Sequence, residues 1–258
     1  MKSFWTKAAL AAAAVGCMGV AHASTTSTID FENVDSSNAP SVPFVYDLDS
    51  IRQAGYSIGA YDPHNAGNAP DGGFVGALVN GGDTDACQTF ACPHGNTSNF
   101  LDVINDGVMF LNHGGVQLTL NSFDAAFLPP SGLQLPSSTV AFLAIEADRA
   151  DSPDDYTVGI FALRGPTSGD TSFASFLASN AQIIHGPGTL TSGDVTRLFA
   201  YTYYCDSTSG NCSFGGTNRG QFAIDNISIT AVPEPSSWLL LAVGLGALGV
   251  AARRRRSA

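Results

Sequence analysis

The sequence between residues 24 and 232 contains no lysine and only two glutamates. Five arginines in this region stand against 21 acidic residues, most of them aspartates. A region this acidic repels nucleic-acid phosphates and anionic lipid surfaces, and divalent cations are its natural small partners. Aspartate is also a turn former and a source of solubility, so the excess of acid does not by itself indicate a binding site.

Motifs of the common enzyme chemistries are absent as well. The sequence has no Gly-x-Ser-x-Gly elbow, no His-Glu-x-x-His pair, no phosphate-binding glycine loop and no EF-hand loop. The histidines after residue 23 occur singly among Gly, Pro and Asn, as is typical of exposed loop residues: His64, His94, His113 and His185. These absences favour a non-enzymatic protein, and we predict no catalytic residue.

The N-terminus has the order of a secretory signal peptide. Lys2 and Lys7 flank the start of an alanine-rich apolar run over residues 8–20, and the triplet Ala21, His22, Ala23 is an A-x-A cleavage site. The apolar run is too short to cross a bilayer. We therefore predict a signal peptide over residues 1–23, cleavage before Ser24, and an exported protein.

The C-terminus has three parts in a fixed order. The stiff stretch Pro233, Glu234, Pro235 cannot continue a helix. An apolar helix-forming run over residues 238–252 follows, and the chain closes on Arg253, Arg254, Arg255 and Arg256. Arginines at the end of an apolar segment stay in the cytoplasm. At about 1.5 Å per residue the run is shorter than the ~30 Å hydrocarbon core, which indicates a weak transmembrane anchor.

This order resembles the PEP-CTERM sorting signal of Gram-negative bacteria, which an exosortase processes. The resemblance covers residues 233–258 and implies signal peptidase and exosortase as partners during export. It also implies transient anchoring in the inner membrane through the C-terminal helix, followed by release to the cell surface or extracellular matrix. Proteins with this signal occur in organisms that produce exopolysaccharide and form biofilms or flocs.

Residues 24–232 have the texture of one all-β domain. Short apolar runs alternate with clusters of Gly, Ser, Thr, Asn, Asp and Pro. Residues 116–120 alternate between apolar and polar side chains, as in a strand with one solvent-exposed face. Residues 139–145 are nearly all apolar, as in a central strand. Helical spacing occurs only in a short stretch around Phe173, Phe176 and Leu177. We predict a single jelly-roll-like β-sandwich between the signal peptide and the sorting tail.

Four cysteines remain after removal of the signal peptide. Cys87 lies close to Cys92 in the sequence, and Cys205 lies close to Cys212. Both pairs occur in polar loops of an exported protein, where the compartment is oxidising. Four cysteines allow three pairings. We predict the two local disulfides.

The two ends of the domain carry a candidate metal site. A strand at residues 29–33 places Asp30 and Glu32 on one face, and the apolar phase slips at Asp225, which predicts a β-bulge. These segments resemble the first and last strands of calcium-stabilised jelly rolls, the fold of many carbohydrate-binding modules. If the two strands are neighbours, Asp30, Glu32 and Asp225 could share a structural calcium ion. The alternative is solvated carboxylates on edge strands.

A second acidic pattern, Glu146-x-Asp148-x-x-Asp151, resembles the catalytic strand of laminarinase-like retaining glycosidases. The last position is Asp rather than Glu, so its side chain is one methylene shorter than that of the acid/base residue in those enzymes. The segment also continues directly into a turn. A solvated hairpin tip is the alternative interpretation. Aromatic residues near the second cysteine pair form either a sugar-stacking platform or part of the core: Tyr201, Tyr203, Tyr204 and Phe214.

The sequence thus favours a structural or glycan-binding module of the envelope or extracellular matrix, linked to exopolysaccharide. A glycan-active hydrolase is the alternative. A binding module should present a shallow aromatic strip without a pair of buried carboxylates. A glycosidase should present two carboxyl groups about 5 to 9 Å apart in a groove.

Overall fold

The computed structural model describes residues 24–63, 73–83, 85–86, 92–129, 135–149, 155–166, 171–206, 211–214 and 220–232. Within them, Thr26–Val232 forms one compact unit. The signal peptide and the sorting tail lie outside the described residues, so the domain limits drawn from the sequence stay a prediction. The all-β prediction is confirmed, because the named elements are strands and one short 3-10 helix.

One run of strands carries the long central strands β10 and β14, which pair with each other along most of their length. From edge to edge its order is β2 (Asp35–Asn38), β4 (Ser50–Gln53), β5 (Tyr56–Tyr61), β8 (Val108–Asn112), β14 (Val195–Cys205), β10 (Thr139–Arg149), β11 (Tyr156–Arg164) and β13 (Gln182–His185). The short strand β15 (Cys212–Phe214) pairs with the end of β14.

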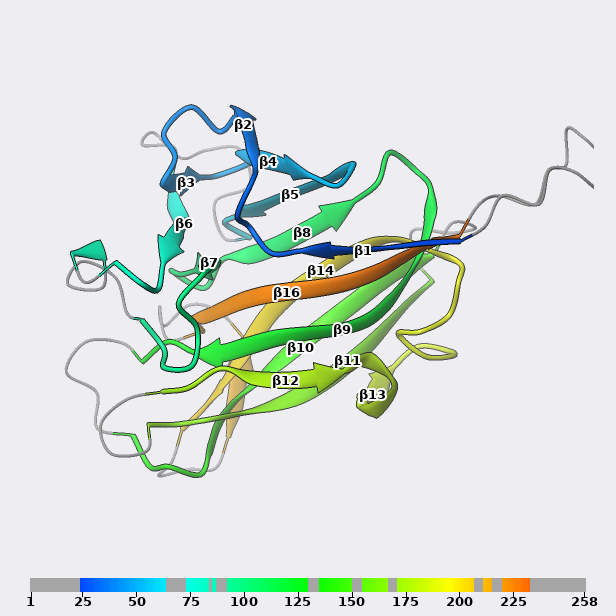
Figure 1. Cartoon of the computed structure of the whole chain (residues 1–258). Coiled ribbons are helices and arrows are strands. Elements are labelled where there is room, and N and C mark those ends of the chain that lie inside the picture. The colour runs from blue at the N-terminus through cyan, green and yellow to red at the C-terminus, as the bar shows by residue number, and fades with distance from the viewer. Residues whose placement is uncertain are drawn as a thin grey trace, which may run out of the picture. The chain divides into compact units, whose positions relative to one another are not determined.

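The other run contains both the first and the last strand of the domain. Its order is β12 (Ala174–Leu177), β9 (Gln117–Phe127), β16 (Phe222–Val232), β7 (Asn99–Val103), β6 (Phe74–Asn80) and β3 (Phe44–Tyr46), with β1 (Thr25–Ile29) also paired to β16. Figure 1 shows β1 alongside β16. Among the described residues, the register pair that joins the two runs is Val195 and Leu118, where β14 meets β9. Apart from this join they form the two layers of a sandwich.

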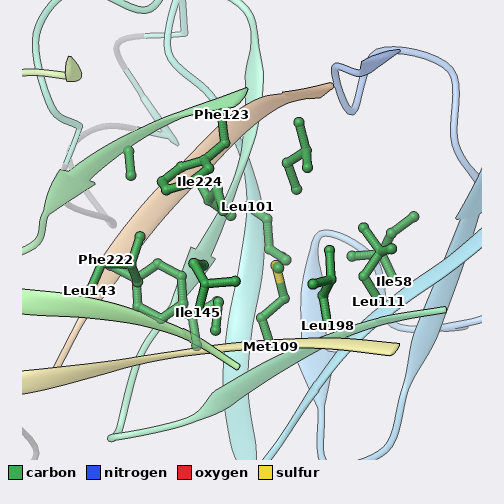
Figure 2. Packing of buried hydrophobic residues seen from close by; sticks show 14 of the residues in the cluster. Ile58, Leu101, Met109, Leu111, Phe123, Leu143, Ile145, Leu198, Phe222 and Ile224 are labelled. Atoms are coloured by element: carbon green, nitrogen blue, oxygen red, sulfur yellow. The ribbon is translucent and has the colours of Figure 1, made fainter. Parts of the chain in front are cut away.

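The main core lies between these layers. Large side chains from both runs are buried together, and Figure 2 shows ten of them: Ile58, Leu101, Met109, Leu111, Phe123, Leu143, Ile145, Leu198, Phe222 and Ile224. The ring of Phe123 in β9 meets Phe161 of β11 edge-on at 5.0 Å and stacks on Phe176 of β12 at 5.4 Å. Burial of aromatic rings on this scale is the main stabilising contribution to such a fold.

The stretch around Phe173 to Leu177 corrects one expectation from the sequence. Its helical spacing is misleading, because residues Ala174–Leu177 form strand β12, paired antiparallel with β9. The short 3-10 helix η1 (Ala178–Asn180) begins only after this strand. Pairing with β9 brings Phe176 against the core. The pairing of these two strands therefore determines the backbone conformation of residues 174–177, although their local sequence pattern favours a helix.

A smaller cluster covers the outer face of the β6, β7 and β16 strands. The segment around His94 lies against residues 171–173: the His94 amide donates to the Thr171 carbonyl, and the Phe173 amide donates to the His94 carbonyl. Phe173 then packs edge-on against Phe100 at 5.3 Å. Alternation along β7 places Asp102 on the same side as Phe100, beneath this cover.

The predicted disulfide between Cys205 and Cys212 is present and joins β14 to β15. Cys92 is also disulfide-bonded. Its predicted partner, Cys87, lies outside the described residues. The first of these bridges holds Phe214 beside the end of β14, since Tyr203 and Phe214 are register partners.

Candidate functional site

Strand alternation creates an aromatic face on the outside of the β14 layer. Along β14 the side chains of Val195, Leu198 and Ala200 are buried, whereas Phe199 and Tyr201 are only partly covered. The neighbouring strand β10 is in register, with Glu146 opposite Phe199 and Ala144 opposite Tyr201. Aromatic and acidic side chains therefore share one face, pointing away from the main core.

This face is hollowed into a groove of about 420 Å³. The groove is lined by Tyr61, Pro63, Val108, Glu146, Asp148, Tyr156, Phe199, Tyr201, Tyr203 and Phe214. These residues come from β5, β8, β10, β11, β14 and β15 and from the turn after β5. A concave, mostly aromatic surface with a few converging polar groups is the general form of a small-ligand site.

The aromatic walls of the groove support one another. Tyr201 lies 4.8 Å from Phe214 and 5.7 Å from Tyr203, measured between ring centres. On the other side, Tyr61 meets Phe199 edge-on at 6.3 Å. The rings are tilted or perpendicular in these contacts, an arrangement that aromatic quadrupoles favour. Packed in this way, the rings give the groove rigid apolar walls.

Two carboxylates lie in the groove on a single strand. Glu146 and Asp148 are two residues apart in β10, so their Cα atoms are about 7 Å apart. The hydroxyl of Tyr201 donates to Oε2 of Glu146 at 3.2 Å. Asp148 is 5% exposed and its Oδ2 pairs with Nη2 of Arg197 at 2.8 Å. The guanidinium of Arg197 in turn lies 5.7 Å from the centre of the Phe199 ring.

Burial controls the protonation of these groups. It raises the pKa of Glu146, against the opposing effect of the Tyr201 hydrogen bond. Burial also raises the pKa of Asp148, which the Arg197 guanidinium partly offsets. The pKa of Tyr201 is raised by burial and by the charge of Glu146, so its hydroxyl stays protonated and remains a donor. The groove therefore resists carrying two uncompensated negative charges.

A larger hollow of about 770 Å³ opens elsewhere, between β9 and β12 on one side and β10 and β11 on the other. Its lining includes Phe127, Phe142, Phe161 and Phe176 but no acidic side chain. It lies along the edge of the main core, and the described residues that line it include no Asp, Glu or His. The groove on β14 is therefore the better candidate for a functional site.

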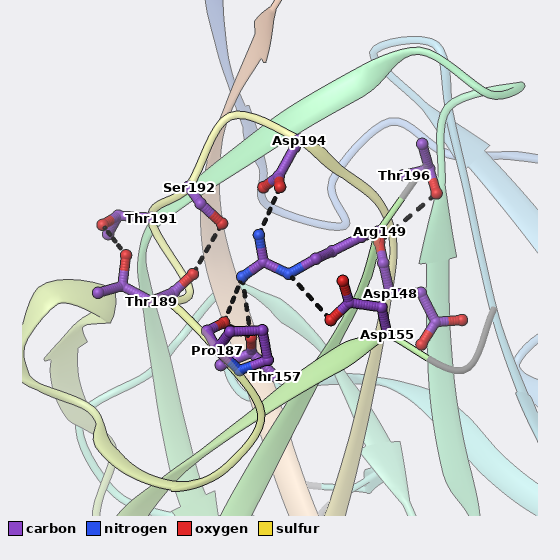
Figure 3. Close-up of polar contacts among 10 residues, drawn as sticks. All are labelled: Asp148, Arg149, Asp155, Thr157, Pro187, Thr189, Thr191, Ser192, Asp194 and Thr196. Atoms are coloured by element: carbon purple, nitrogen blue, oxygen red, sulfur yellow. Dashed lines mark hydrogen bonds and ion pairs between the residues drawn. The ribbon is translucent and has the colours of Figure 1, made fainter. Parts of the chain in front are cut away.

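Arg149 anchors the loop beside the groove. It is the last residue of β10, directly after Asp148, where the pairing with β14 shifts register. Its guanidinium pairs with Asp194 and donates to the Pro187 carbonyl at 2.6 Å and to Oγ1 of Thr157 at 2.9 Å. Figure 3 shows these partners around the guanidinium. The loop between β13 and β14 is thereby fixed to the start of β11, the strand that carries Tyr156.

The last residues of β16 lead directly into the sorting tail. Ala231 and Val232 still pair with Leu118 and Gln117 of β9. Residues 231–256 match the PEP-CTERM protein-sorting motif. The PEP-CTERM motif implies an exported protein that is transiently anchored in the membrane and processed by exosortase during export. Among the described residues no helix is long and apolar enough to cross a membrane; the predicted anchor at residues 238–252 lies outside them.

No curated protein matches the sequence of this chain. Among solved structures, the domain is similar to the CBM22-2 xylan-binding domain of Xyn10C from Paenibacillus barcinonensis. The match has 12% identity and a TM-score of 0.35, and it covers 80% of this chain and 99% of that chain. Xylan binding is a property of that domain.

The first and last strands are neighbours, as the metal-site hypothesis requires. The strand predicted at residues 29–33 is wrong, however: β1 ends at Ile29 and Phe31 is left-handed, so Asp30 and Glu32 do not share one face of a strand. The Oγ1 atoms of Thr26 in β1 and Thr230 in β16 are 2.8 Å apart. A left-handed residue, Asn226, interrupts β16 directly after Asp225, and the pairing with β9 is irregular there. The phase slip in the sequence therefore does correspond to a bulge.

The three predicted ligands nevertheless have separate partners. Asp30 accepts from Gln53, and Glu32 accepts from the Asn99 amide at 2.8 Å. Asp225 is buried and accepts from Asn96 at 2.6 Å. In the described part of the chain no three His, Cys, Asp or Glu side chains form a group that could hold a metal ion. Calcium binding by Asp30, Glu32 and Asp225 stays a prediction from the sequence.

That prediction has a direct thermal test. If calcium binds only the folded chain, millimolar calcium should stabilise it by about 2.7 kcal/mol at a hundredfold excess over the dissociation constant. The full chain should then melt at a higher temperature in calcium than in chelator. Asp225→Ala should remove most of the difference, whereas Asp85→Ala, on an exposed turn, should not. Equal melting temperatures with and without chelator would rule the calcium site out.

The groove contains some of the residues singled out from the sequence and several that were not. Tyr201, Tyr203 and Phe214 line it, as a stacking platform requires. Tyr204 does not: it is 6% exposed and stacks on Phe127 toward the core. Glu146 and Asp148 line the groove, whereas Asp151 lies outside the described residues. Phe199 shares the face of Tyr201 and Tyr203 by alternation along β14. The residues that the sequence did not indicate are Tyr61, Pro63, Val108 and Tyr156, because their segments reach the groove only through the fold of the sheet.

Proposed function

We propose that the domain is a glycan-binding module that holds a polysaccharide chain along the groove on β14 and β10. The observation that carries this proposal is the set of aromatic rings lining an open groove next to two carboxylates. Flat aromatic faces take the apolar face of a pyranose ring, and carboxylates accept hydrogen bonds from its hydroxyl groups. The exopolysaccharide layer of the cell envelope is the proposed setting, because the sorting motif implies export.

A variant in the aromatic wall tests the proposal. Tyr201→Ala removes a ring that contacts both Phe214 and Tyr203, so we expect affinity for the bound oligosaccharide to fall at least tenfold, about 1.4 kcal/mol. The ligand is first selected by screening the full chain on a glycan array, and affinities are then measured by titration calorimetry. Tyr46→Ala, a ring outside the groove that contacts Phe74, is the matched control. Equal losses in the two variants would contradict the proposed site.

A glycan-active hydrolase is the second candidate, and the paired carboxylates favour it. Glu146 and Asp148 lie two residues apart on the same face of β10, and a glycosidase needs two carboxyl groups close together in a groove. The pair of covered carboxylates departs from what we expected of a binding module. We nevertheless place binding first, because the ion pair with Arg197 at 2.8 Å occupies Asp148, the second of the two carboxyl groups. Release of new reducing ends from an oligosaccharide, abolished in Glu146→Gln, would instead support hydrolysis.

A further inference from the structure

The charges inside the groove do not balance. Its one neighbouring guanidinium, that of Arg197, is held by Asp148 at 2.8 Å. Glu146 accepts a hydrogen bond from the neutral hydroxyl of Tyr201. Among the described residues Glu146 takes part in no ion pair. Among the described residues the groove thus presents one half-buried carboxylate, that of Glu146, which no ion pair neutralises and whose burial the nearby Arg197 and His185 offset only in part.

The composition of the chain limits the cations that can reach Glu146. Residues 24–232 contain no lysine, so no flexible ammonium group can reach Glu146 from this region. The imidazole of His185 is stacked on Tyr156 at 4.6 Å, and its attraction for Glu146 is smaller than the opposing effect of burial. A partly buried carboxylate without a counter-charge is costly, and a cation brought by the ligand would remove that cost.

The aromatic walls restrict what kind of cation can enter. Faces of Tyr201, Tyr203 and Phe214 around the groove attract a positive charge through their quadrupoles and also accept the apolar face of a sugar ring. A hexosamine with a free amino group offers both features in one unit. A neutral sugar would leave Glu146 unpaired, and a uronic acid would add a second negative charge beside it.

We infer that the groove selects glycans that carry free amino groups, such as a de-N-acetylated hexosamine polymer, over neutral and acidic glycans. This inference rests on the proposed glycan binding and specifies the class of ligand. The ammonium group would pair with Glu146 while the sugar ring stacks on the aromatic wall formed by Tyr201 and Phe214.

Three hexasaccharides of different charge test the inference. The full chain, purified in mild detergent, is titrated calorimetrically with a β-1,4-linked glucosamine hexamer, the fully N-acetylated hexamer and a galacturonic acid hexamer. We expect the glucosamine hexamer to bind at least tenfold more tightly than the N-acetylated one, and the galacturonic acid hexamer to bind most weakly. The advantage of the glucosamine hexamer should shrink with added salt, because it is electrostatic.

Variants assign the selectivity to one side chain. Glu146→Gln should bring the affinity ratio between the glucosamine and N-acetylated hexamers close to one, whereas Asp85→Asn on an exposed turn should leave the ratio unchanged. Equal or tighter binding of the N-acetylated hexamer to the unmodified chain would overturn the selectivity and leave the proposed function standing. A preference that survives Glu146→Gln would also overturn it. If neither these hexamers nor any array glycan binds, the proposed function itself fails.

Discussion

Replacing Arg149 by methionine should lower the free energy of unfolding by about 2 kcal/mol. The Arg149 side chain is only 11% exposed, and its guanidinium meets the carboxylate of Asp194, the carbonyl of Pro187 and the hydroxyl of Thr157. Methionine keeps most of the apolar stem, so packing loss is small. The loss arises because the β13–β14 loop and the start of β11 lose the group that joins them, and of its three partners the hydroxyl of Thr157 is fully buried.

Urea denaturation followed by circular dichroism measures this effect. Arg52→Met is the matched control, since Arg52 is an exposed residue of β4 and its replacement should change stability by less than about 0.5 kcal/mol. Similar losses in the two variants would show that the Arg149 contacts contribute little. Arg149→Met should also weaken glycan binding, because the loop that it anchors adjoins the strand of Tyr156.

Replacing Asp102 by asparagine should make the protein more stable at pH 8 and should flatten its stability against pH. Asp102 is fully buried in β7 between Ala223 of β16 and Ala77 of β6, and its Oδ1 has no hydrogen-bond partner. Burial alone raises the pKa of this carboxyl well above its usual value. The folded chain therefore retains this proton at a pH at which the unfolded chain has already lost it.

The sign of the effect follows from proton linkage. Above about pH 4 the folded state binds more protons at Asp102 than the unfolded state, so the free energy of unfolding falls as the pH rises. One such group contributes a slope of up to about 1.4 kcal/mol per pH unit until the folded carboxyl itself ionises. Asparagine has nearly the same shape but does not titrate, so this contribution disappears.

Denaturation curves of both proteins between pH 4 and 8 would measure the difference. Asp35→Asn is the opposite control: hydrogen bonds from Ser37 lower the pKa of exposed Asp35, so that residue favours the folded state as the pH rises. Parallel curves for the unmodified chain and Asp102→Asn would mean that Asp102 does not hold its proton in the folded state.

Local and linear features could be predicted from the sequence. Signal peptides and sorting tails act as short contiguous segments, so Ala21 to Ser24 and Pro233 to Arg256 predict export without knowledge of the fold, and the PEP-CTERM match agrees. Alternation of apolar and polar residues predicted the strand that became β9, because alternate side chains of a strand point to opposite faces, and a continuous apolar run predicted the central strand β10. The disulfide between Cys205 and Cys212 could also be predicted, because its two cysteines are close together in the chain.

Only the tertiary structure decided which of these faces became a site. Glu146 and Asp148 acquire their environment from Phe199, Tyr201 and Arg197, which belong to a strand some 50 positions away and enter the groove through the β10 and β14 register. The same pairing places Tyr203 in the groove and turns Tyr204 toward the core. Composition alone does not show which of two adjacent tyrosines is exposed to a ligand and which is buried. Burial, counter-charge and register are properties of neighbours across the sheet, and for that reason the sequence predicted the all-β domain and its export whereas the folded sheet determined the groove.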